Sequence, residues 1–490
     1  MKTYRIFALV LIFFAGFILS FGGAVFAEGP AVGPLTLVSG PSPFEQGCGG
    51  GSPFGFINYY NYKVEPYIAV NPVDPSNIVV SWMQDEWNWG GANGMVAAAT
   101  HDGGRTWKRT VIPGLTQCSG GTAQRAADPW LTFAPNGDLY RSTVVSNADF
   151  TNATVLVNKS TDGGDTWSGP VVVHTNTSPN SIDDKEMIAA DPFDSRYLYV
   201  TWHETQFASG TQPTMNAQHS HAIRMPLWFT RSTDSGATWE QARKIFDPGE
   251  HNSTTGPQIV VLPNGDLLNV FTLMADQQTA KAQTDIAVMR STDKGASWSK
   301  PAIIGSLTPV YVNDPTTGEW LFTGSELPDI AVDKRNGDVY IVWEDGRFSG
   351  YAIEGIAFIK STDGGLTWSA PAQVNKDAYA PAFTPSVAVA DNGTIAVTYY
   401  DLRNDTSDPT VLQTDHWVVV SHDGGQTWTE AHVAGPFDMR SAPARGAAWY
   451  FIGDYMGLTS SGNSFVAAFT MANDGVLSNP TDIFVSTITP

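Results

Sequence analysis

Short runs of apolar and β-branched residues recur along the chain, separated by polar segments rich in Gly, Asn, Asp and Pro. Short apolar runs bounded by turn residues are typical of β-strands rather than of helices. Many of these runs lie in pairs joined by an Asn-Gly dipeptide, which is favoured in tight hairpins, as at Asn136-Gly137 and Asn336-Gly337. The pattern therefore predicts an all-β chain built from antiparallel hairpins.

An eight-residue pattern, Ser/Thr-x-Asp-x-Gly-x-Thr/Ser-Trp, occurs six times at spacings of 59 to 72 residues. Its aspartates are Asp102, Asp162, Asp234, Asp293, Asp363 and Asp423. Asp can cap a turn by accepting backbone N–H groups, Gly permits positive φ, and Trp can pack on the sheet. Six near-identical copies indicate a structural hairpin turn, and a catalytic or metal-binding role for these aspartates is the weaker interpretation.

A second repeat lies before each of these boxes. It is an apolar strand that begins at Pro66, Pro129, Glu186, Pro257, Pro328 and Pro385. Each unit therefore consists of strand 1, a tight turn, strand 2, a loop, strand 3, the box and strand 4. A repeated four-stranded unit of this kind predicts a β-propeller.

The number of units follows from the two ends of the chain. After the sixth box, residues 455–459, 465–469 and 482–487 predict three strands of a seventh unit. Its fourth strand can come from residues 33–38, which resemble the strand that follows a box. We therefore expect seven blades rather than six, in one domain spanning 28–490, with the N-terminal strand completing the C-terminal blade and leaving no exposed edge.

Residues 1–27 have the composition of a signal peptide, with Lys2 and Arg5 before an uncharged apolar stretch and Val25-Phe26-Ala27 at its end. The alternative is an uncleaved membrane anchor, and either way we expect a secreted or cell-surface protein. The formal charge of −21 argues against nucleic acid or an anionic membrane surface as a partner. The two cysteines, Cys48 and Cys118, lie in loops that lead into neighbouring blades, so we expect a disulfide between them.

The boxes and the strands between them resemble the Asp-box (bacterial neuraminidase repeat) propellers of the sialidase superfamily. The resemblance implies a glycan-cleaving enzyme of the exo-α-sialidase type, in which three arginines hold the substrate carboxylate, a Tyr-Glu pair supplies the nucleophile and an Asp acts as acid and base. The family carries Phe-Arg-Ile-Pro in its first blade. Here the corresponding strand has Glu65 in place of Arg, and the nearest match, 223–226, lies in the third blade.

Strand direction separates two faces of the predicted propeller. The box and Asn-Gly turns share one face, and the longer loops, for example 203–222, share the other, which we call the open face. Polar residues end strand 2 on the open face at the equivalent positions Gln84, Glu204, Asp345 and Asp401. Only some blades carry them, which favours a site, because long loops on a rigid scaffold commonly carry function.

In a sialidase-like enzyme, Tyr399 or Tyr400 would be the nucleophile. Acid and base work would fall to Asp401, Asp345, Glu344 and Glu204. The predicted substrate-binding residues are Arg347, Arg403, Arg125, Asp128, Lys185, Trp87 and His203. The alternative is that these groups form ion pairs within or between blades, such as Asp345 with Arg347 and Asp401 with Arg403.

Three functions remain open at this point: a glycoside hydrolase acting on an acidic-sugar glycan, a polysaccharide lyase acting on uronates, and a propeller that binds glycan or protein without turnover. We expect no cofactor; a structural Ca²⁺ among the surface Asp residues is left open, but no ordered series of ligands indicates one. We expect a monomer whose partner is a glycan.

Overall fold

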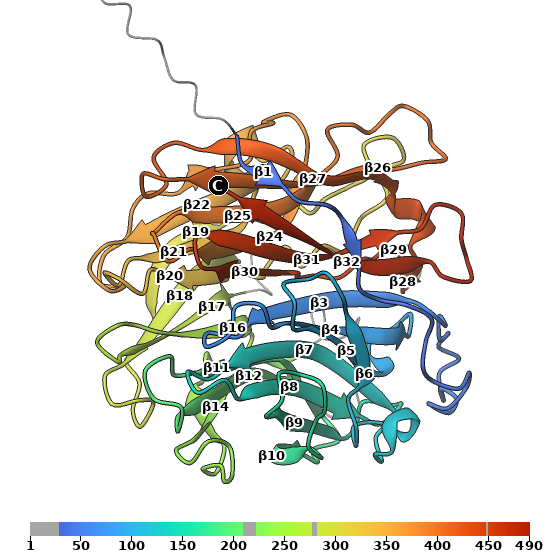
Figure 1. Ribbon diagram of the computed structural model, residues 1–490, viewed down its shortest axis with the longest axis vertical. Coiled ribbons are helices and arrows are strands. Elements are labelled where there is room, and N and C mark those ends of the chain that lie inside the picture. The colour runs from blue at the N-terminus through green and yellow to red at the C-terminus, as the bar shows by residue number, and fades with distance from the viewer. Residues whose placement is uncertain (1–28, 209–221, 277–281, 447–448) are drawn as a thin grey trace, which may run out of the picture.

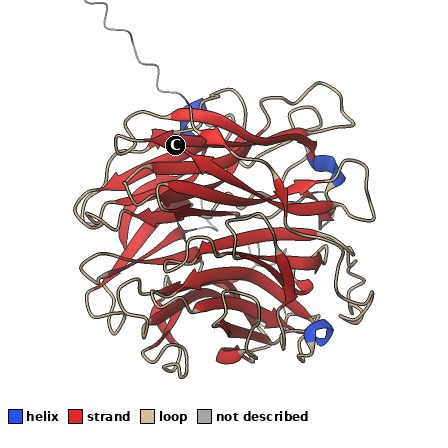
Figure 2. Ribbon diagram, viewed as in Figure 1, coloured by secondary structure: helices blue, strands red, loops and turns tan. Residues whose placement is uncertain are grey.

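The computed structural model describes residues 29–208, 222–276, 282–446 and 449–490. The expected signal peptide lies outside the described residues, as does much of the open-face loop 203–222. Figure 2 shows that nearly all regular structure is strand. The helical turns are η1 (Gln117–Ser119), η2 (Gly346–Ser349) and η3 (Met439–Ser441). No helix within the described ranges is long and apolar enough to cross a membrane.

The strands are arranged in antiparallel four-stranded units (Figure 1). The first strands are β3 (Lys63–Val70), β7 (Arg125–Phe133), β11 (Ser181–Ala190), β16 (Ser253–Val261), β20 (Asp329–Val332), β24 (Ala382–Val389) and β30 (Gly457–Ser461). The second strands are β4 (Ile78–Glu86), β8 (Leu139–Ser146), β12 (Leu198–Phe207), β17 (Leu267–Ala275), β21 (Val339–Asp345), β25 (Ile395–Asp401) and β31 (Ser464–Ala472). The third strands are β5 (Ala92–Thr100), β9 (Ala153–Ser160), β14 (Leu227–Ser232), β18 (Gln283–Ser291), β22 (Gly355–Ser361), β26 (Gln413–Ser421) and β32 (Thr481–Thr489).

The fourth strands form the outer edges of the sheets. They are β6 (Lys108–Val111), β10 (Val171–Asn176), β15 (Arg243–Phe246), β19 (Ala302–Leu307), β23 (Ala372–Gln373) and β27 (Thr429–Asp438). At the outer edge of the last sheet, β1 (Ala31–Val32) and β2 (Thr36–Leu37) pair with β32. The blue N-terminal segment accordingly runs beside the red C-terminal strands in Figure 1. A short strand, β13 (Ala222–Arg224), pairs with β12, and β28 (Ala444–Arg445) pairs with β29 (Trp449–Tyr450).

The core lies between adjacent units. The first strands contact one another in chain order, and β30 also contacts β3. All nine residues of β4 and all nine of β5 are buried. Both faces of these strands are therefore covered, which explains why apolar residues follow one another in them, as at 78–80 and 95–99, instead of alternating strictly with polar ones.

Each Asp box is a hydrogen-bonded turn. In the fourth box, Asp293 accepts the backbone N–H of Ser297 at 2.8 Å and its hydroxyl at 2.6 Å, and it also accepts the hydroxyl of Ser291 at 2.8 Å. The other five boxes repeat these contacts. Hydrogen bonds from Thr106 hold the pKa of Asp102 well below its usual range. The aspartates are thus committed to the turns.

A β-bulge interrupts five of the first strands at the same place. The pairing register shifts within β3, β7, β11, β16 and β24. The residues with positive φ at these bulges are Glu65 (56°), Asp128 (56°), Lys185 (52°), Gly256 (58°) and Thr384 (50°). Pro follows four of them. Pro cannot donate to the ladder, so it is accommodated in a bulge, and each of these strands begins a few residues before the position expected from sequence.

Candidate functional site

The bulges of β3, β7 and β11 bring three charged side chains together. Non-glycine residues with positive φ cost about 1–3 kcal/mol each and gather at functional sites. At these bulges they are Glu65, Asp128 and Lys185. The chain before β30 adds Asp454, which follows Gly453. A Cβ at Gly453 would lie 2.9 Å from the backbone nitrogen of Glu65, so glycine permits this close approach.

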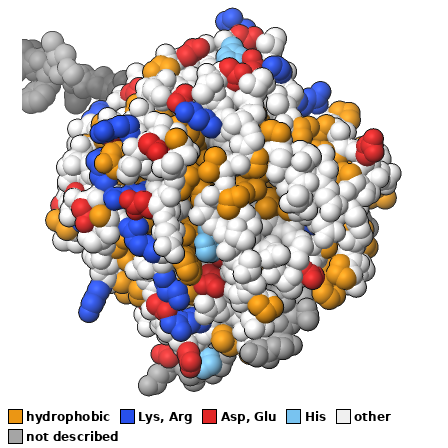
Figure 3. All heavy atoms as spheres, turned by 90° about the horizontal axis from the view of Figure 1, so that it is seen from below, with side chains coloured by type: hydrophobic (Ala, Val, Ile, Leu, Met, Phe, Trp, Pro, Cys, Tyr) orange, Lys and Arg blue, Asp and Glu red, His pale blue; other side chains and the backbone are white. Residues whose placement is uncertain are grey.

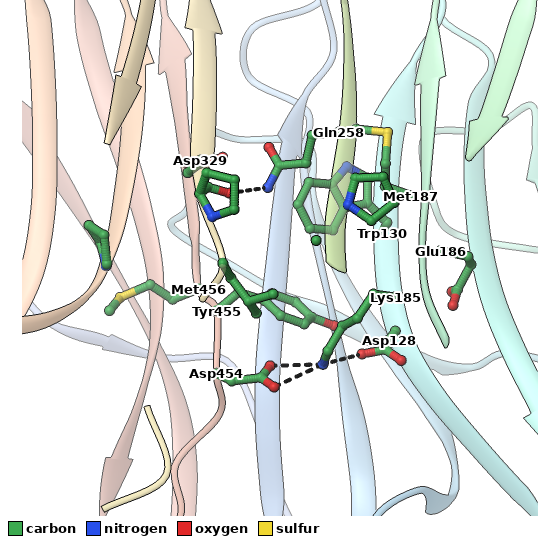
Figure 4. Close-up of a pocket in the computed structure, with 15 residues that line it drawn as sticks. Asp128, Trp130, Lys185, Glu186, Met187, Gln258, Asp329, Asp454, Tyr455 and Met456 are labelled. Carbon is green, nitrogen blue, oxygen red and sulfur yellow. Dashed lines mark hydrogen bonds and ion pairs between the residues drawn. The ribbon is translucent and has the colours of Figure 1, made fainter. Parts of the chain in front are cut away.

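Lys185 lies at the centre of this group, which we call the central cluster: Glu65, Glu86, Asp128, Lys185, Arg445 and Asp454. The Nζ atom of Lys185 is 2.9 Å from Asp128 Oδ1 and 2.9 Å from Asp454 Oδ2 (Figure 4). Arg445 lies 3.9 Å from Glu65. The cluster therefore holds four carboxyl groups and two cations, all largely buried.

The two carboxyl groups bonded to Lys185 have opposite pKa displacements. Burial raises the pKa of Asp128 to about 6, although Lys185 opposes the rise. Burial also acts on Asp454, but Lys185 and Arg445 outweigh it and hold the pKa of Asp454 below its usual value. Near neutral pH the ionised form of Asp454 is therefore favoured, while Asp128 holds its proton more strongly than an ordinary aspartate.

The other two carboxyl groups of the cluster resist ionisation. Burial raises the pKa of Glu86 to about 8, with Arg445 acting against it. Burial raises the pKa of Glu65 well above its usual value. A protonated carboxyl group carries no charge, so burying it costs less desolvation free energy than burying a carboxylate. Protonation of Glu65 and Glu86 therefore lowers the free-energy cost of burying the cluster.

Two pockets meet at the Asp128–Lys185 pair. The central pocket has an empty volume of about 540 Å³ and is lined by Trp130, Tyr455 and Met456 together with Asp128, Lys185 and Asp454 (Figure 4). Trp130 stacks on Tyr67 with ring centroids 3.8 Å apart. The pocket thus has both aromatic and charged lining residues, a combination that suits a sugar ring.

The second pocket, which we call the side pocket, has an empty volume of about 430 Å³ and contains Arg125 and Arg445. The Arg125 guanidinium carbon lies 3.5 Å from the ring centroid of Trp87. Its Nη1 donates to two backbone carbonyls, whereas its Nε and Nη2 atoms have no hydrogen-bond partner among the described residues. Burial lowers the pKa of Arg125 to about 10, so the group stays charged at neutral pH. A buried guanidinium with unused donors is suited to an anion.

Asp128, Lys185 and Arg125 thus gather at two adjoining pockets, whereas most of the other predicted residues do not. The strand-2 residues that occupy equivalent positions each accept a hydrogen bond from a tryptophan indole. The pairs are Gln84 with Trp82 (3.0 Å), Glu204 with Trp228 (3.0 Å), Asp345 with Trp343 (2.8 Å) and Asp401 with Trp417 (2.9 Å). The four residues occupy equivalent positions because each forms the same hydrogen bond to a tryptophan within its own sheet.

The predicted arginines Arg347 and Arg403 form ion pairs inside their own units. Arg347 lies 2.7 Å from Asp345. Arg403 lies 2.6 Å from Asp401 and 2.7 Å from Glu430. The structure therefore does not bring Arg347 and Arg403 to Arg125, and these contacts match the structural alternative considered for them.

The predicted nucleophiles point to opposite faces of β25, as neighbouring residues of a strand do. The Tyr399 hydroxyl donates to Glu430, and the Tyr400 hydroxyl donates to the carbonyl of Thr470 at 2.7 Å. Burial raises the pKa of both above the usual value, which disfavours a phenolate nucleophile at either position. Neither lines the central pocket.

The remaining predicted residues also have structural partners. Glu344 accepts the backbone N–H of Thr384 at 2.8 Å, and burial raises its pKa. His203 is buried, with Nε2 3.9 Å from Asp184. Trp87 lies beneath Arg125 and donates to Asn93 at 3.0 Å, so it supports an arginine. Cys48 and Cys118 form a disulfide with their Cα atoms 5.1 Å apart.

Asp454 and Tyr455 were not among the predicted site residues. The sequence Gly453-Asp-Tyr-Met-Gly457 takes the place of the X-Pro bulge in the last unit. Alignment of this segment with Glu65-Pro66 and Asp128-Pro129 could have identified Asp454. Within the described ranges, no group of three or more His, Cys, Asp or Glu side chains is arranged to hold a metal ion.

Comparison with known proteins supports the repeat and leaves the activity open. The BNR/Asp-box repeat family model matches residues 419–430, which confirms the expected repeat. A xyloglucanase of a Paenibacillus species is 29% identical over 221 residues, or 44% of this chain and 18% of its own. A xyloglucanase of Acetivibrio thermocellus is 25% identical over 330 residues, or 64% of this chain and 33% of its own. The chain thus spans a third or less of these relatives.

Among solved structures, the NanB sialidase of Streptococcus pneumoniae aligns with 93% of this chain and 70% of its own, at 13% identity and a TM-score of 0.45. A likeness this distant carries no argument about substrate. The described residues form an all-β protein of four-stranded Asp-box units with a buried cluster of charged side chains.

Proposed function

We propose that this protein is a glycoside hydrolase whose reaction takes place at the boundary between the central and side pockets. One observation carries the proposal: two carboxyl groups share the ammonium group of Lys185 yet have pKa values displaced in opposite directions. Glycosidases need one protonated and one ionised carboxyl group at the scissile bond. The names of the xyloglucanase relatives support the same reaction class.

In this proposal Asp128 is the general acid and Asp454 is the nucleophile or base. Asp128 donates its proton to the glycosidic oxygen, while ionised Asp454 attacks the anomeric carbon or removes a proton from water. Because each has an oxygen 2.9 Å from the same Nζ, those oxygens lie no more than about 6 Å apart. This short separation favours direct attack, since a water-mediated mechanism generally needs about 6.5–9.5 Å.

We propose that the substrate carries an acidic sugar whose anion binds Arg125 in the side pocket. The unused Nε and Nη2 donors of Arg125 and the adjacent cations Lys185 and Arg445 support this placement. This is the sialidase-like version of the function, with Arg125 kept from the three arginines first considered and Arg347 and Arg403 left out. The xyloglucanase relatives make a neutral glycan the competing substrate.

The proposed setting is a secreted monomer. We propose that residues 1–27 are removed on export and that the units form one closed seven-bladed ring. The contacts between successive first strands, the contact of β30 with β3, and the pairing of β1 and β2 with β32 support the ring.

The test is a substrate screen of the purified protein with matched variants. The substrates are sialosides, polygalacturonate, xyloglucan and arabinan, with new reducing ends measured as the product. Asp128→Asn and Asp454→Asn should each lower turnover by about 10²–10⁴-fold. Asp138→Asn, which removes a carboxylate from the surface ion pair with Lys159, should leave turnover unchanged. Unchanged turnover in both central variants would remove the basis of the proposal.

The screen also separates the other two functions. A lyase would yield an unsaturated product that absorbs ultraviolet light, and its base would be a Tyr or His203. Burial raises the pKa of Tyr455, the tyrosine of the central pocket, which disfavours that route. A non-catalytic propeller would bind glycan without releasing any product.

A further inference from the structure

A groove on the open face is separate from the two pockets at the centre. We call it the rim groove. It lies between the loops 314–317, 377–381 and 402–407, has an empty volume of about 690 Å³, and is lined in part by Tyr379, Asp377, Arg403 and Asp405. It contains none of the residues that line the central or side pocket. It therefore requires its own explanation.

Tyr379 is the most exposed aromatic residue that lines the rim groove, with 95% of the residue's surface accessible to solvent. Its backbone N–H donates to Asp377 at 2.8 Å, which holds the loop in a turn. Pro315 supplies exposed apolar surface beside it, and the buried residues Pro381 and Leu402 lie beneath the groove. An exposed aromatic ring on a concave surface offers a flat face against which the C–H groups of a sugar ring can stack.

The groove also carries fixed polar groups. Arg403 is held by Asp401 on one side and Glu430 on the other, and its guanidinium carbon lies 3.7 Å from the ring centroid of Trp417. Arg403, which the sequence predicted to bind substrate, is therefore a fixed part of this groove. Such preorganisation lowers the entropy lost when a ligand binds.

The charges of the groove indicate a neutral ligand. One oxygen of Asp377 accepts the N–H of Tyr379, and one oxygen of Asp405 accepts the N–H of Gln413 at 3.0 Å. The structure assigns no partner among the described residues to the second oxygen of either carboxylate. Since the two acids of Arg403 already balance its charge, the groove presents a net negative surface. This surface repels uronates and accepts hydrogen bonds from sugar hydroxyls.

We propose that the rim groove binds a neutral sugar unit of a polysaccharide, with Tyr379 stacking on the ring and Asp377 and Asp405 accepting its hydroxyl groups. This proposal rests on the proposed function in one respect, namely that the ligand is a carbohydrate. The rim groove is formed by loops of the fifth and sixth units, whereas the side pocket is formed by residues of the first three units and Arg445. A second site at this position fits a polymeric substrate that extends across the open face.

The test measures binding of the purified protein by retardation in native gels containing xyloglucan, arabinan or polygalacturonate. Tyr379→Ala should weaken retardation by a neutral polymer about tenfold, and Asp377→Asn with Asp405→Asn should weaken it further. Tyr351→Ala is the matched control, because Tyr351 is also exposed (59%) on an open-face loop but does not line the groove. Circular dichroism confirms that each variant is folded.

Two results would overturn the assignment: neutral polymers that fail to retard the unaltered protein, or equal retardation of Tyr379→Ala and the unaltered protein. The binding assay does not depend on turnover. If Asp128→Asn with Asp454→Asn binds normally but the unaltered protein cleaves nothing, the hydrolase proposal fails and the rim groove stands. If the unaltered protein cleaves a substrate but Tyr379→Ala does not change its affinity for neutral polymers, the rim-groove proposal fails and the hydrolase proposal stands.

Discussion

Lys185 should be essential to the stability of the central cluster, and replacing it with methionine tests this. The Nζ atom lies 2.9 Å from both Asp128 and Asp454, and its side chain is only 14% exposed. Methionine keeps most of the volume and removes the charge. Breaking a buried ion pair by removing one partner costs about 3–5 kcal/mol, because it leaves an uncompensated buried charge.

The cost should depend on pH in a defined direction. Lys185 and Arg445 hold the pKa of Asp454 below normal, so this group contributes stability that is present above its unfolded pKa and is lost as pH falls through the folded value. Without Lys185, Asp454 becomes easier to protonate. We therefore expect Lys185→Met to lower the free energy of unfolding by about 3–5 kcal/mol at pH 7 and by much less at pH 4.

Urea denaturation followed by circular dichroism at both pH values measures this difference. Lys159→Met is the control, because Lys159 forms a partly exposed ion pair with Asp138 at 2.8 Å and should cost about 1 kcal/mol or less. A Lys185→Met loss that is no larger than that of the control, or that is equal at pH 4 and pH 7, would refute the reasoning.

Three further predictions follow from the contacts. The pKa of Glu86 is raised to about 8 in the folded protein, so the folded state binds more protons than the unfolded state and the free energy of unfolding falls as the pH rises from about 5 to 8. Glu86→Gln should make this fall smaller. An unchanged pH dependence in urea titrations would contradict the prediction. Cys118→Ser should lower the free energy of unfolding by about 2–5 kcal/mol, since the bond joins residues 70 apart, and adding reductant to the variant should have no further effect. Arg403→Met should lower the free energy of unfolding by about 3–5 kcal/mol, because it leaves Asp401 and Glu430 without their cation. Turnover per folded molecule on a short, soluble substrate should stay unchanged. A loss of turnover without a loss of stability would instead show that Asp401 and Arg403 are catalytic residues.

The local repeats could be predicted from the sequence because they are short-range. In the Asp box, the Asp, Gly and Thr/Ser that build the turn lie within eight residues, so their chemistry is visible in the letters themselves. The same holds for the Asn-Gly hairpins and for the four-strand order of each unit. The distribution of charge, by contrast, could not be predicted. The net charge is −21, yet Figure 3 shows a row of Lys and Arg side chains along one side of the view.

The site was predicted only in part, for two physical reasons. The strand-2 carboxylates, for example Asp345 and Asp401, differ between units and so resembled a functional set, yet each binds a tryptophan of its own sheet. Conversely, Asp128 was predicted, but Pro66 and Pro129 concealed the bulges that place it in one cluster with Glu65. A bulge depends on the pairing of two strands, which a single segment does not display.

The sequence by itself determined the class of fold, its repeating unit and the turn chemistry, since these depend on neighbours along the chain. Only the tertiary structure decided which charges meet. Lys185 and Asp454 are far apart in sequence, and their contact exists because the first strand of one unit and the approach to the last unit share the same centre. Lys185 lowers the pKa of both Asp128 and Asp454, and Arg445 lowers that of Asp454 further, so the candidate chemistry arises from the arrangement of the units around these two cations.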